Sequence, residues 1–204
     1  MRRLGQIPLT LLFMALALGV NHAKQPKPRL SKDPLTPEQV AIYRAVLAQY
    51  VGKDSSAALN IANRTEPFGS HLPGGEDECS KGLPMETVTQ PPIVHDLSPA
   101  VALGPNMVLV DPKRQAKLVR KNDPDNLLHQ HKAISDSELH DSVAQAFSTG
   151  LFTFSEILFD KSHEHALLSY SFWCGGLCGH GKTLMMKKSE GKWITDRECS
   201  SWIS

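Results

Sequence analysis

The segment from Cys174 to Thr183 holds the residues whose types and spacing best suit chemistry. It reads Cys174-Gly175-Gly176-Leu177-Cys178-Gly179-His180-Gly181-Lys182-Thr183. Its last eight residues fit G-x-x-x-x-G-K-[ST], the pattern of loops that cradle nucleotide phosphates with backbone N–H groups. Such a loop must run into a helix whose N-terminus faces the phosphates. The nucleotide interpretation therefore depends on whether a helix begins at Thr183.

The residues after Thr183 do not suit a nucleotide-binding loop. Residues 183–188 are all that precede Ser189-Glu190-Gly191, which is typical of a hairpin turn, so no helix has room there. We therefore interpret Gly176, Gly181, Lys182 and Thr183 as a chance match, place Lys182 at a sheet edge, and expect no cofactor.

The cysteines favour disulfides. The chain has four, Cys79, Cys174, Cys178 and Cys199, and an even number in an exported protein is typical of a disulfide framework. Four cysteines allow three pairings, and the sequence does not choose between them. We favour Cys174 with Cys178, because the glycines between and around them let the chain fold back tightly. Cys79 would then pair with Cys199.

The same residues offer two alternatives. Cys174, Cys178 and His180 are zinc-ligand types, although C-x3-C-x-H departs from the usual zinc spacings. The fourth ligand could be Cys79, Cys199, His163 or His165. A redox-active cysteine pair is the other alternative, although the C-x-x-C spacing and its helix are missing. Both remain open as a metal-binding or thiol-redox function of this hairpin.

The N-terminus predicts export. Residues 1–23 combine Arg2 and Arg3 with an apolar run from Ile7 to Val20 and a small residue, Ala23, at the expected cleavage point, which together indicate a signal peptide. The run is too short to span a bilayer comfortably, and no later stretch is long and apolar enough. We expect a secreted or periplasmic protein without a transmembrane segment after cleavage.

Charge argues against nucleic acid as a partner. Cleavage removes Arg2 and Arg3, so 22 − 2 = 20 Lys and Arg would face 21 Asp and Glu, a formal charge of −1. Phosphate backbones need a concentrated positive surface instead. The basic residues of 113–121 recur at helical spacing, which favours a solvated helix face.

The remaining chain predicts a single globular domain over residues 35–204, preceded by a proline-rich linker at 24–34. Helices are expected after the caps Thr36, Asp111 and Ser135. The third helix carries an apolar stripe, Leu139, Val143, Ala146 and Phe147, and should end at Gly150. Residues 64–92 are rich in proline and glycine and predict a long loop insertion that carries Cys79.

The C-terminal third predicts strands. Residues 151–159, 165–173, 183–188 and 192–199 are rich in β-formers, and 165–173 alternates between apolar and polar residues. Short links between them favour an antiparallel meander of about four strands. The class is α+β, with the N-terminal helices packed on one face of that meander.

The last quarter of the chain also resembles a known group. Cys174 to Gly179, then Gly191-Lys192-Trp193 and Trp202-Ile203-Ser204, are similar to motifs of a group of exported bacterial proteins without an assigned function. The resemblance implies a bacterial, extracytoplasmic protein, and it brings no catalytic residues.

No complete catalytic set is present in the sequence. We therefore expect an exported domain without enzymatic activity, which binds a partner or serves the cell envelope.

Overall fold

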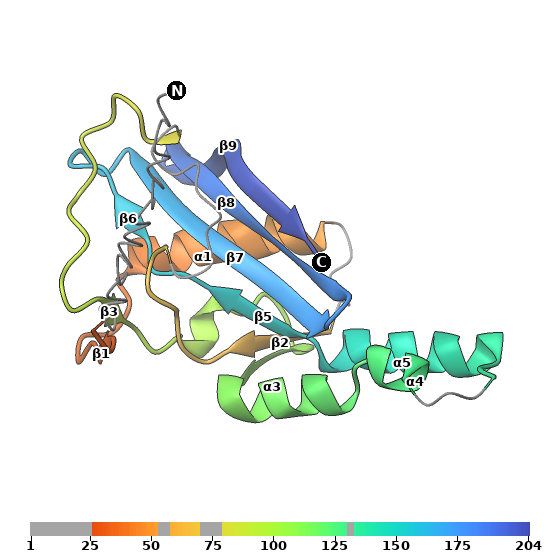
Figure 1. Cartoon of the computed structure of the whole chain (residues 1–204). Coiled ribbons are helices and arrows are strands. Elements are labelled where there is room, and N and C mark those ends of the chain that lie inside the picture. Colours follow the sequence, from red (N-terminus) through yellow and green to blue (C-terminus); the bar gives the residue numbers. More distant parts are fainter. Residues whose placement is uncertain (1–25, 53–57, 70–78, 130–132) are drawn as a thin grey trace, which may run out of the picture.

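The computed structural model describes residues 26–52, 58–69, 79–129 and 133–204 (Figure 1). The predicted signal peptide, residues 1–23, lies outside them. Within these ranges, no helix is long and apolar enough to cross a membrane. The elements, in chain order, are β1 (Arg29–Leu30), α1 (Pro37–Val51), β2 (Leu59–Ala62), β3 (Ile93–Val94), the 3-10 helix η1 (Pro99–Val101), β4 (Met107–Val110), α3 (Pro112–Lys121), α4 (Asp125–Leu128), α5 (Asp136–Thr149), β5 (Leu151–Phe154), β6 (Leu158–Phe159), β7 (His165–Gly175), β8 (Cys178–Ser189) and β9 (Lys192–Ile203). The predicted α+β class is confirmed.

The three long helices begin at the caps that the sequence indicates. The Thr36 hydroxyl accepts a hydrogen bond from the Gln39 amide and the Gln39 side chain accepts one from the Thr36 amide, a complete capping box. Ser135 and Glu138 repeat that arrangement at α5, and the Asp111 carboxylate caps α3. These contacts satisfy backbone donors that have no partner within the helix.

The main sheet is larger than the predicted meander and is mixed. Its strand order is β4-β2-β5-β7-β8-β9, with β6 paired to β7. The strands from β5 to β9 are antiparallel, whereas β2 lies parallel to both β4 and β5. Short links predict antiparallel neighbours, but parallel pairing joins segments far apart in sequence, and no local pattern predicts it.

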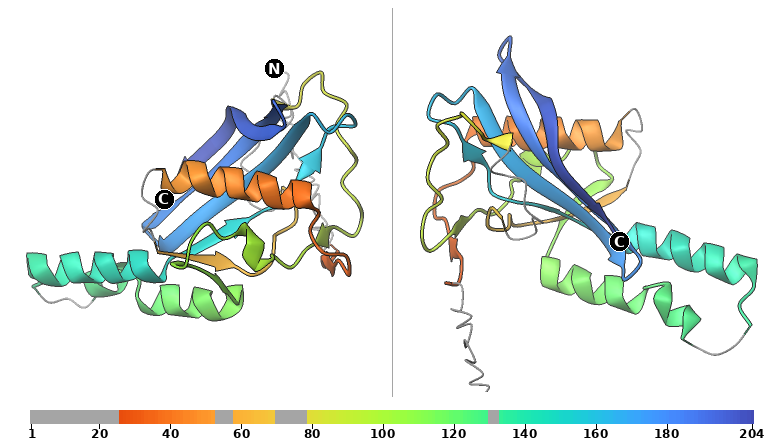
Figure 2. Two further views of the ribbon diagram at one scale, coloured as in Figure 1. Left: turned by 180° about the vertical axis from the view of Figure 1, so that it is seen from behind. Right: turned by 45° about the horizontal axis from the view of Figure 1, so that its top comes forward.

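Helices cover both faces of this sheet, not one face as predicted (Figure 2). Alternation along β5 puts Phe152 on the face that α1 covers, where its ring centroid lies 4.8 Å from that of Tyr50. Leu151, its neighbour, faces the other way and packs with Val119 of α3. Because each face has an apolar set, each needs its own cover.

The predicted insertion is tied down at its described residues. Cys79 is bonded to Cys199 of β9, and with Leu83 and Met85 it packs onto Leu167 and Met185 of the sheet. The predicted linker holds β1, which pairs with β3 in a separate two-stranded sheet. Both segments are therefore part of the fold where the structure describes them.

The helix α5 projects past the end of the sheet, as two views agree (Figures 1 and 2). Of its predicted apolar stripe only Ala146 is buried, whereas Leu139, Val143 and Phe147 are 41%, 36% and 54% exposed. The stripe thus does not face the core as the predicted packing required, and it borders an apolar groove instead.

Candidate functional site: an apolar groove between α5 and the cysteine hairpin

The turn between β7 and β8 forms one wall of the groove. A disulfide joins Cys174 to Cys178 across it, with the two Cα atoms 5.1 Å apart. Gly175 has φ +151°, a conformation that L side chains rarely adopt, and an added Cβ would lie 2.5 Å from Asp123 Oδ1. This turn therefore requires glycine and closely approaches the corner between α3 and α4.

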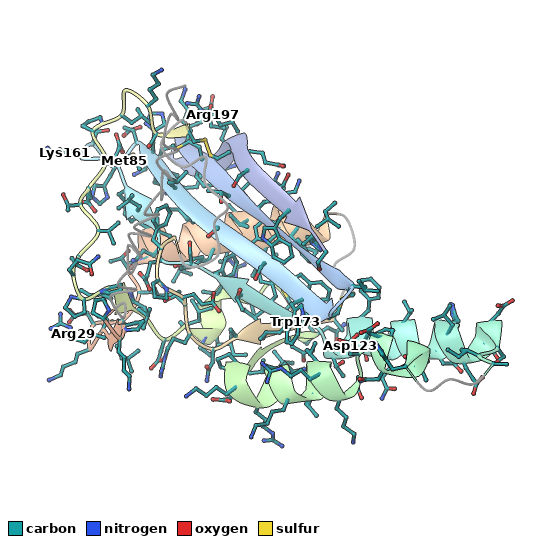
Figure 3. The ribbon with its side chains drawn as sticks, viewed as in Figure 1. Arg29, Met85, Asp123, Lys161, Trp173 and Arg197 are labelled. Carbon is teal, nitrogen blue, oxygen red and sulfur yellow. A yellow bond between two sulfur atoms is a disulfide. The ribbon has the colours of Figure 1, made fainter. Side chains whose placement is uncertain are left out.

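Asp123 fixes that corner to the turn. Its Oδ2 accepts a hydrogen bond from the Gly176 amide at 2.7 Å, and its Oδ1 accepts one from the Asp125 amide at 3.1 Å. Figure 3 shows Asp123 at this end of β7, near Trp173. A charged acceptor makes stronger hydrogen bonds than a neutral one, so the hairpin and the helical corner form one firm unit.

The other wall is α5. Phe147 stacks on Phe172 of β7, with ring centroids 6.1 Å apart, and Gly150 lets the helix end directly against the Phe172 ring. Leu139, Val143 and Phe147 follow at intervals of four residues, so they lie on one side of the helix. That side faces the cavity.

The cavity between these walls has a volume of about 460 Å³. Its floor is formed by the buried Phe172 and Cys174, and its apolar rim carries Leu177 and Ile203, which are 72% and 88% exposed. The structure describes ten large hydrophobic side chains as exposed, and five of them line this cavity: Leu139, Val143, Phe147, Leu177 and Ile203. Contiguous exposed apolar surface of this kind marks interaction sites.

His180 lies in the floor among aromatic rings. Its imidazole stacks on Tyr50 at 5.7 Å between centroids and lies 5.7 Å from the Phe172 ring. Burial lowers the pKa of His180, and the Lys182 ammonium lowers it further. Burial also raises the pKa of Tyr50 to about 12. At neutral pH the floor is therefore uncharged.

The formally charged residues that line the groove are acidic. Asp123 and Asp125 line the groove, and no Lys or Arg is among its lining residues in the described chain. Asp136 starts α5 three residues before Leu139, on the side of the apolar stripe. The groove thus combines an apolar, uncharged floor with carboxylates at its rim.

The structure divides the predicted site residues between two places. The disulfides are Cys174–Cys178 and Cys79–Cys199, the pairing favoured on sequence grounds, and His180 lies with the first in the groove. His163 and His165 lie at the other end of β7, and nine residues of strand from His165 to Cys174 span about 30 Å. The structure thus does not bring the alternative ligand set together, and among the residues it describes no three His, Cys, Asp or Glu form a group suited to a metal ion.

The nucleotide-loop match has a structural explanation. Its residues form the β7–β8 turn and the start of β8, which continues as strand to Ser189 without a helix. Lys182 pairs with Glu198 at 2.6 Å, and Thr183 is buried. Because β8 lies between β7 and β9, Lys182 is on an inner strand, and its predicted place at the sheet edge is wrong.

His163 joins a surface ion cluster instead. Its Nδ1 lies 3.1 Å from Glu38 and its Nε2 lies 3.5 Å from Glu86, while its ring stacks on Phe159. Lys188 also pairs with Glu38, at 2.9 Å. With both ring nitrogens facing carboxylates, this histidine joins α1 to the turn before β7.

A second histidine–carboxylate pair was not predicted. Nδ1 of His95 lies 2.9 Å from Glu156, whose other carboxylate oxygen accepts from the His95 amide and from the Thr65 hydroxyl. Glu156 lines a separate cavity of about 150 Å³, whereas His95 is not among the lining residues of that cavity. The contacts cross-link three segments of the fold.

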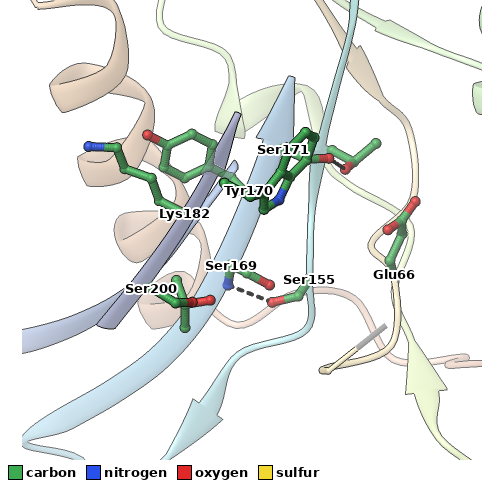
Figure 4. Close-up of a pocket in the computed structure, with 10 residues that line it drawn as sticks. Glu66, Ser155, Ser169, Tyr170, Ser171, Lys182 and Ser200 are labelled. Atoms are coloured by element: carbon green, nitrogen blue, oxygen red, sulfur yellow. Dashed lines mark hydrogen bonds between the residues drawn. The ribbon is translucent and has the colours of Figure 1, made fainter. Parts of the chain in front are cut away.

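A polar hollow on the face opposite α1 is too small for an organic ligand. It is lined by hydroxyl side chains around Ser169, with Glu66 at its edge (Figure 4). Its volume of about 10 Å³ is about that of one water molecule. It therefore does not compete with the groove as a ligand site.

Comparison with protein-family models, with curated proteins and with solved structures found no match to the chain. The site thus rests on its own geometry. Sequence reasoning found its hairpin and its helix separately, but it missed Asp123 and Phe172, which join them. The available signal for α5 was its apolar stripe, which the sequence reasoning assigned to packing on the sheet.

Proposed function

We propose that this protein is an exported binding domain without enzymatic activity, and that its partner occupies the groove between α5 and the cysteine hairpin. The observation that carries this proposal is the convergence of five exposed apolar side chains on one cavity. The two disulfides support an oxidising, extracytoplasmic location.

The energetics favour a binding role for this surface. Burial of apolar surface stabilises by about 25 cal/mol per Å². A partner that covers the exposed apolar side chains of the groove would therefore gain this free energy on binding. The Cys174–Cys178 disulfide and the Asp123 hydrogen bonds hold one wall in place before binding. A preorganised wall lowers the entropy that the partner must offset.

A neutral solvatochromic dye tests the proposal directly. We expect saturable binding with blue-shifted emission, and we expect Phe147→Ser to weaken it at least about tenfold, since the ring forms a central part of the wall. Val108→Ser is the matched control, because Val108 is 51% exposed on the edge strand β4 and Phe147 is 54% exposed. Equal binding by the wild type and both variants would contradict the proposal.

The thiol-redox alternative uses the same hairpin and makes a different prediction. Cys178 is partly exposed on the groove wall, whereas Cys174 is fully buried. A redox protein needs this pair to exchange with a substrate thiol. A protein that does not bind the dye but whose Cys174–Cys178 disulfide exchanges with thiols would favour the redox alternative. A Cys174–Cys178 disulfide that resists millimolar glutathione supports the binding role.

A further inference from the structure

We infer that the segment bound in the groove is an amphipathic helix with a basic polar face, contributed by a partner protein. This inference rests on the proposed function, because it names the occupant of the same groove. Three features of the described residues carry it: the length of the apolar stripe, the sign of the surrounding charge, and the high exposure of the side chains at the rim of the cavity.

The stripe on α5 suits a helix. From Leu139 to Phe147 it covers nine residues, and the eight steps between them extend over about 12 Å of helix axis. A partner helix recognised in this way presents anchors at i, i+3 or i+4, and i+7, over a similar length. The firm hairpin wall opposite α5 closes the groove on the second side, so a single helix would contact both walls.

The charge around the groove favours a cationic partner. Asp123, Asp125 and Asp136 flank the apolar surface, α5 contains no Lys or Arg, and the pKa of His180 is lowered by burial. A fatty acid or an anionic lipid would place its head group against these carboxylates, and no Lys or Arg among the described lining residues would pair with it. A helix with lysine or arginine beside its apolar stripe complements the rim instead.

The exposed side chains at the rim favour a helix over a small ligand. Leu177 and Ile203 line the cavity but are 72% and 88% exposed, so a compound confined to the cavity would contact them and leave much of their surface in water. A helix laid along the groove covers them as well. Burial of such rim residues around an apolar centre is typical of protein interfaces.

A second copy of the chain is a poorer occupant. The helix α3 is its most basic helix, with Lys113, Arg114, Lys117, Arg120 and Lys121. However, Val119 on its apolar side is fully buried against its own sheet. The basic helix therefore cannot offer that side to the groove of a neighbour without unfolding.

Two designed peptides test the inference on the full-length mature protein. Each has about 15 residues, a length near the limit for isolated helices, and the same apolar stripe. One carries lysine on its polar face and the other glutamate. Displacement of the groove-bound neutral dye measures binding, at low salt and at about 0.5 M salt, where exposed charges are screened.

We expect the lysine peptide to displace the dye at a concentration at least about tenfold lower than the glutamate peptide needs, and we expect added salt to reduce this difference. Asp125→Asn with Asp136→Asn should weaken binding of the lysine peptide and reduce its advantage over the glutamate peptide, because the pair removes two carboxylates beside the apolar surface. Asp141→Asn is the matched control, since Asp141 lies about 200° around α5 from Leu139, on the side away from the stripe.

The other outcomes separate this inference from the proposed function. Equal displacement of the dye by both peptides would contradict a basic polar face on the partner. Displacement by a fatty acid and by neither peptide would contradict a helical partner. In both cases the groove would still be the binding site. Dimerisation that blocks the dye site would make a second copy the occupant. A protein that does not bind the dye at all would contradict the proposed function itself.

Discussion

At the residue scale, the indole of Trp202 explains Gly181, the second required glycine of the nucleotide-loop match. Trp202 lies opposite Gly181 in the β8–β9 register, and a Cβ on Gly181 would meet the indole and would lie 2.8 Å from the Tyr170 carbonyl oxygen. A backbone neighbour cannot give way as a flexible side chain can. The glycine is thus required by packing and not by phosphate.

Replacement of these glycines separates the two explanations. We expect Gly181→Ala to lower the free energy of unfolding by about 1–3 kcal/mol, as overpacking usually does. Gly176→Ala should change it by less than about 0.5 kcal/mol, since its Cβ would meet only Asp123 Oδ2 at an ordinary 3.5 Å. Denaturant unfolding measures both. Equal changes in the free energy of unfolding for the two variants would contradict the packing explanation. A phosphate-binding loop would instead need both glycines in order to bind its ligand.

His180 gives the molecule a pH dependence of known sign. Burial, and then Lys182, lower its pKa in the folded state from 6.5, so the unfolded chain binds the proton more tightly. This contribution to stability is complete above the unfolded value and is lost as the pH falls toward the folded one. We expect His180→Phe, which keeps a ring on Tyr50, to remove that loss.

The measurement compares the free energy of unfolding of the two proteins between about pH 7.5 and about pH 5.5, a range that carboxyl groups affect less. The wild type should lose more stability than His180→Phe over that range. Parallel curves would show that His180 is as well solvated in the folded as in the unfolded chain.

At the element scale, the two disulfides have different tasks. Cys79–Cys199 joins residues 120 apart in sequence and holds the insertion on the sheet, whereas Cys174–Cys178 joins residues four apart and shapes the hairpin. In the chain-entropy account, stabilisation grows with the size of the closed loop. The long bridge should therefore serve stability and the short one the groove.

Paired serine variants test this division under non-reducing conditions. We expect Cys79→Ser with Cys199→Ser to cost about 4–5 kcal/mol by loop size alone, and Cys174→Ser with Cys178→Ser about 2 kcal/mol. The second pair should also weaken dye binding, because the hairpin wall loses its closure. A larger stability loss from the short bridge, with the dye site intact, would reverse the assignment.

Local signals in the sequence predicted the three long helices and the C-terminal strands, but not the partners of these elements in the fold. Caps at Thr36, Asp111 and Ser135 and the alternation of β7 mark where the elements begin and which side chains share a face. The parallel pairing of β2 has no local signal. The stripe on α5 was recognised as apolar, but periodicity does not tell whether such a stripe meets a core or a groove.

At the scale of the whole molecule, export remains a prediction. The apolar N-terminal run and Ala23 predict cleavage there, so mass spectrometry of the secreted protein should find Lys24 as its first residue. An intact Met1 in the membrane fraction would contradict it. Secretion would also place both disulfides in an oxidising compartment, where we expect non-reducing peptide mapping to recover both pairs.

The charges of the molecule are arranged around the same site. The helix α3 has only basic charged side chains, whereas Asp136, Glu138 and Asp141 are the formally charged residues of α5, which packs beside it. A basic segment would thus be steered toward α5 and away from α3. Under the proposed binding mode, this arrangement would favour one orientation of a basic helix in the groove.

Backbone amide NMR of the isotope-labelled protein, titrated with the neutral dye and then with the lysine peptide, tests the central claim most directly. The account predicts that shifts cluster at Leu139–Phe147 of α5, at Cys174–His180 of the hairpin and at Ile203, while Val108 and the hydroxyl-lined hollow around Ser169 stay unchanged. Shifts centred on β4 or on that hollow, with α5 unaffected, would show that the ligand binds elsewhere and would contradict the account.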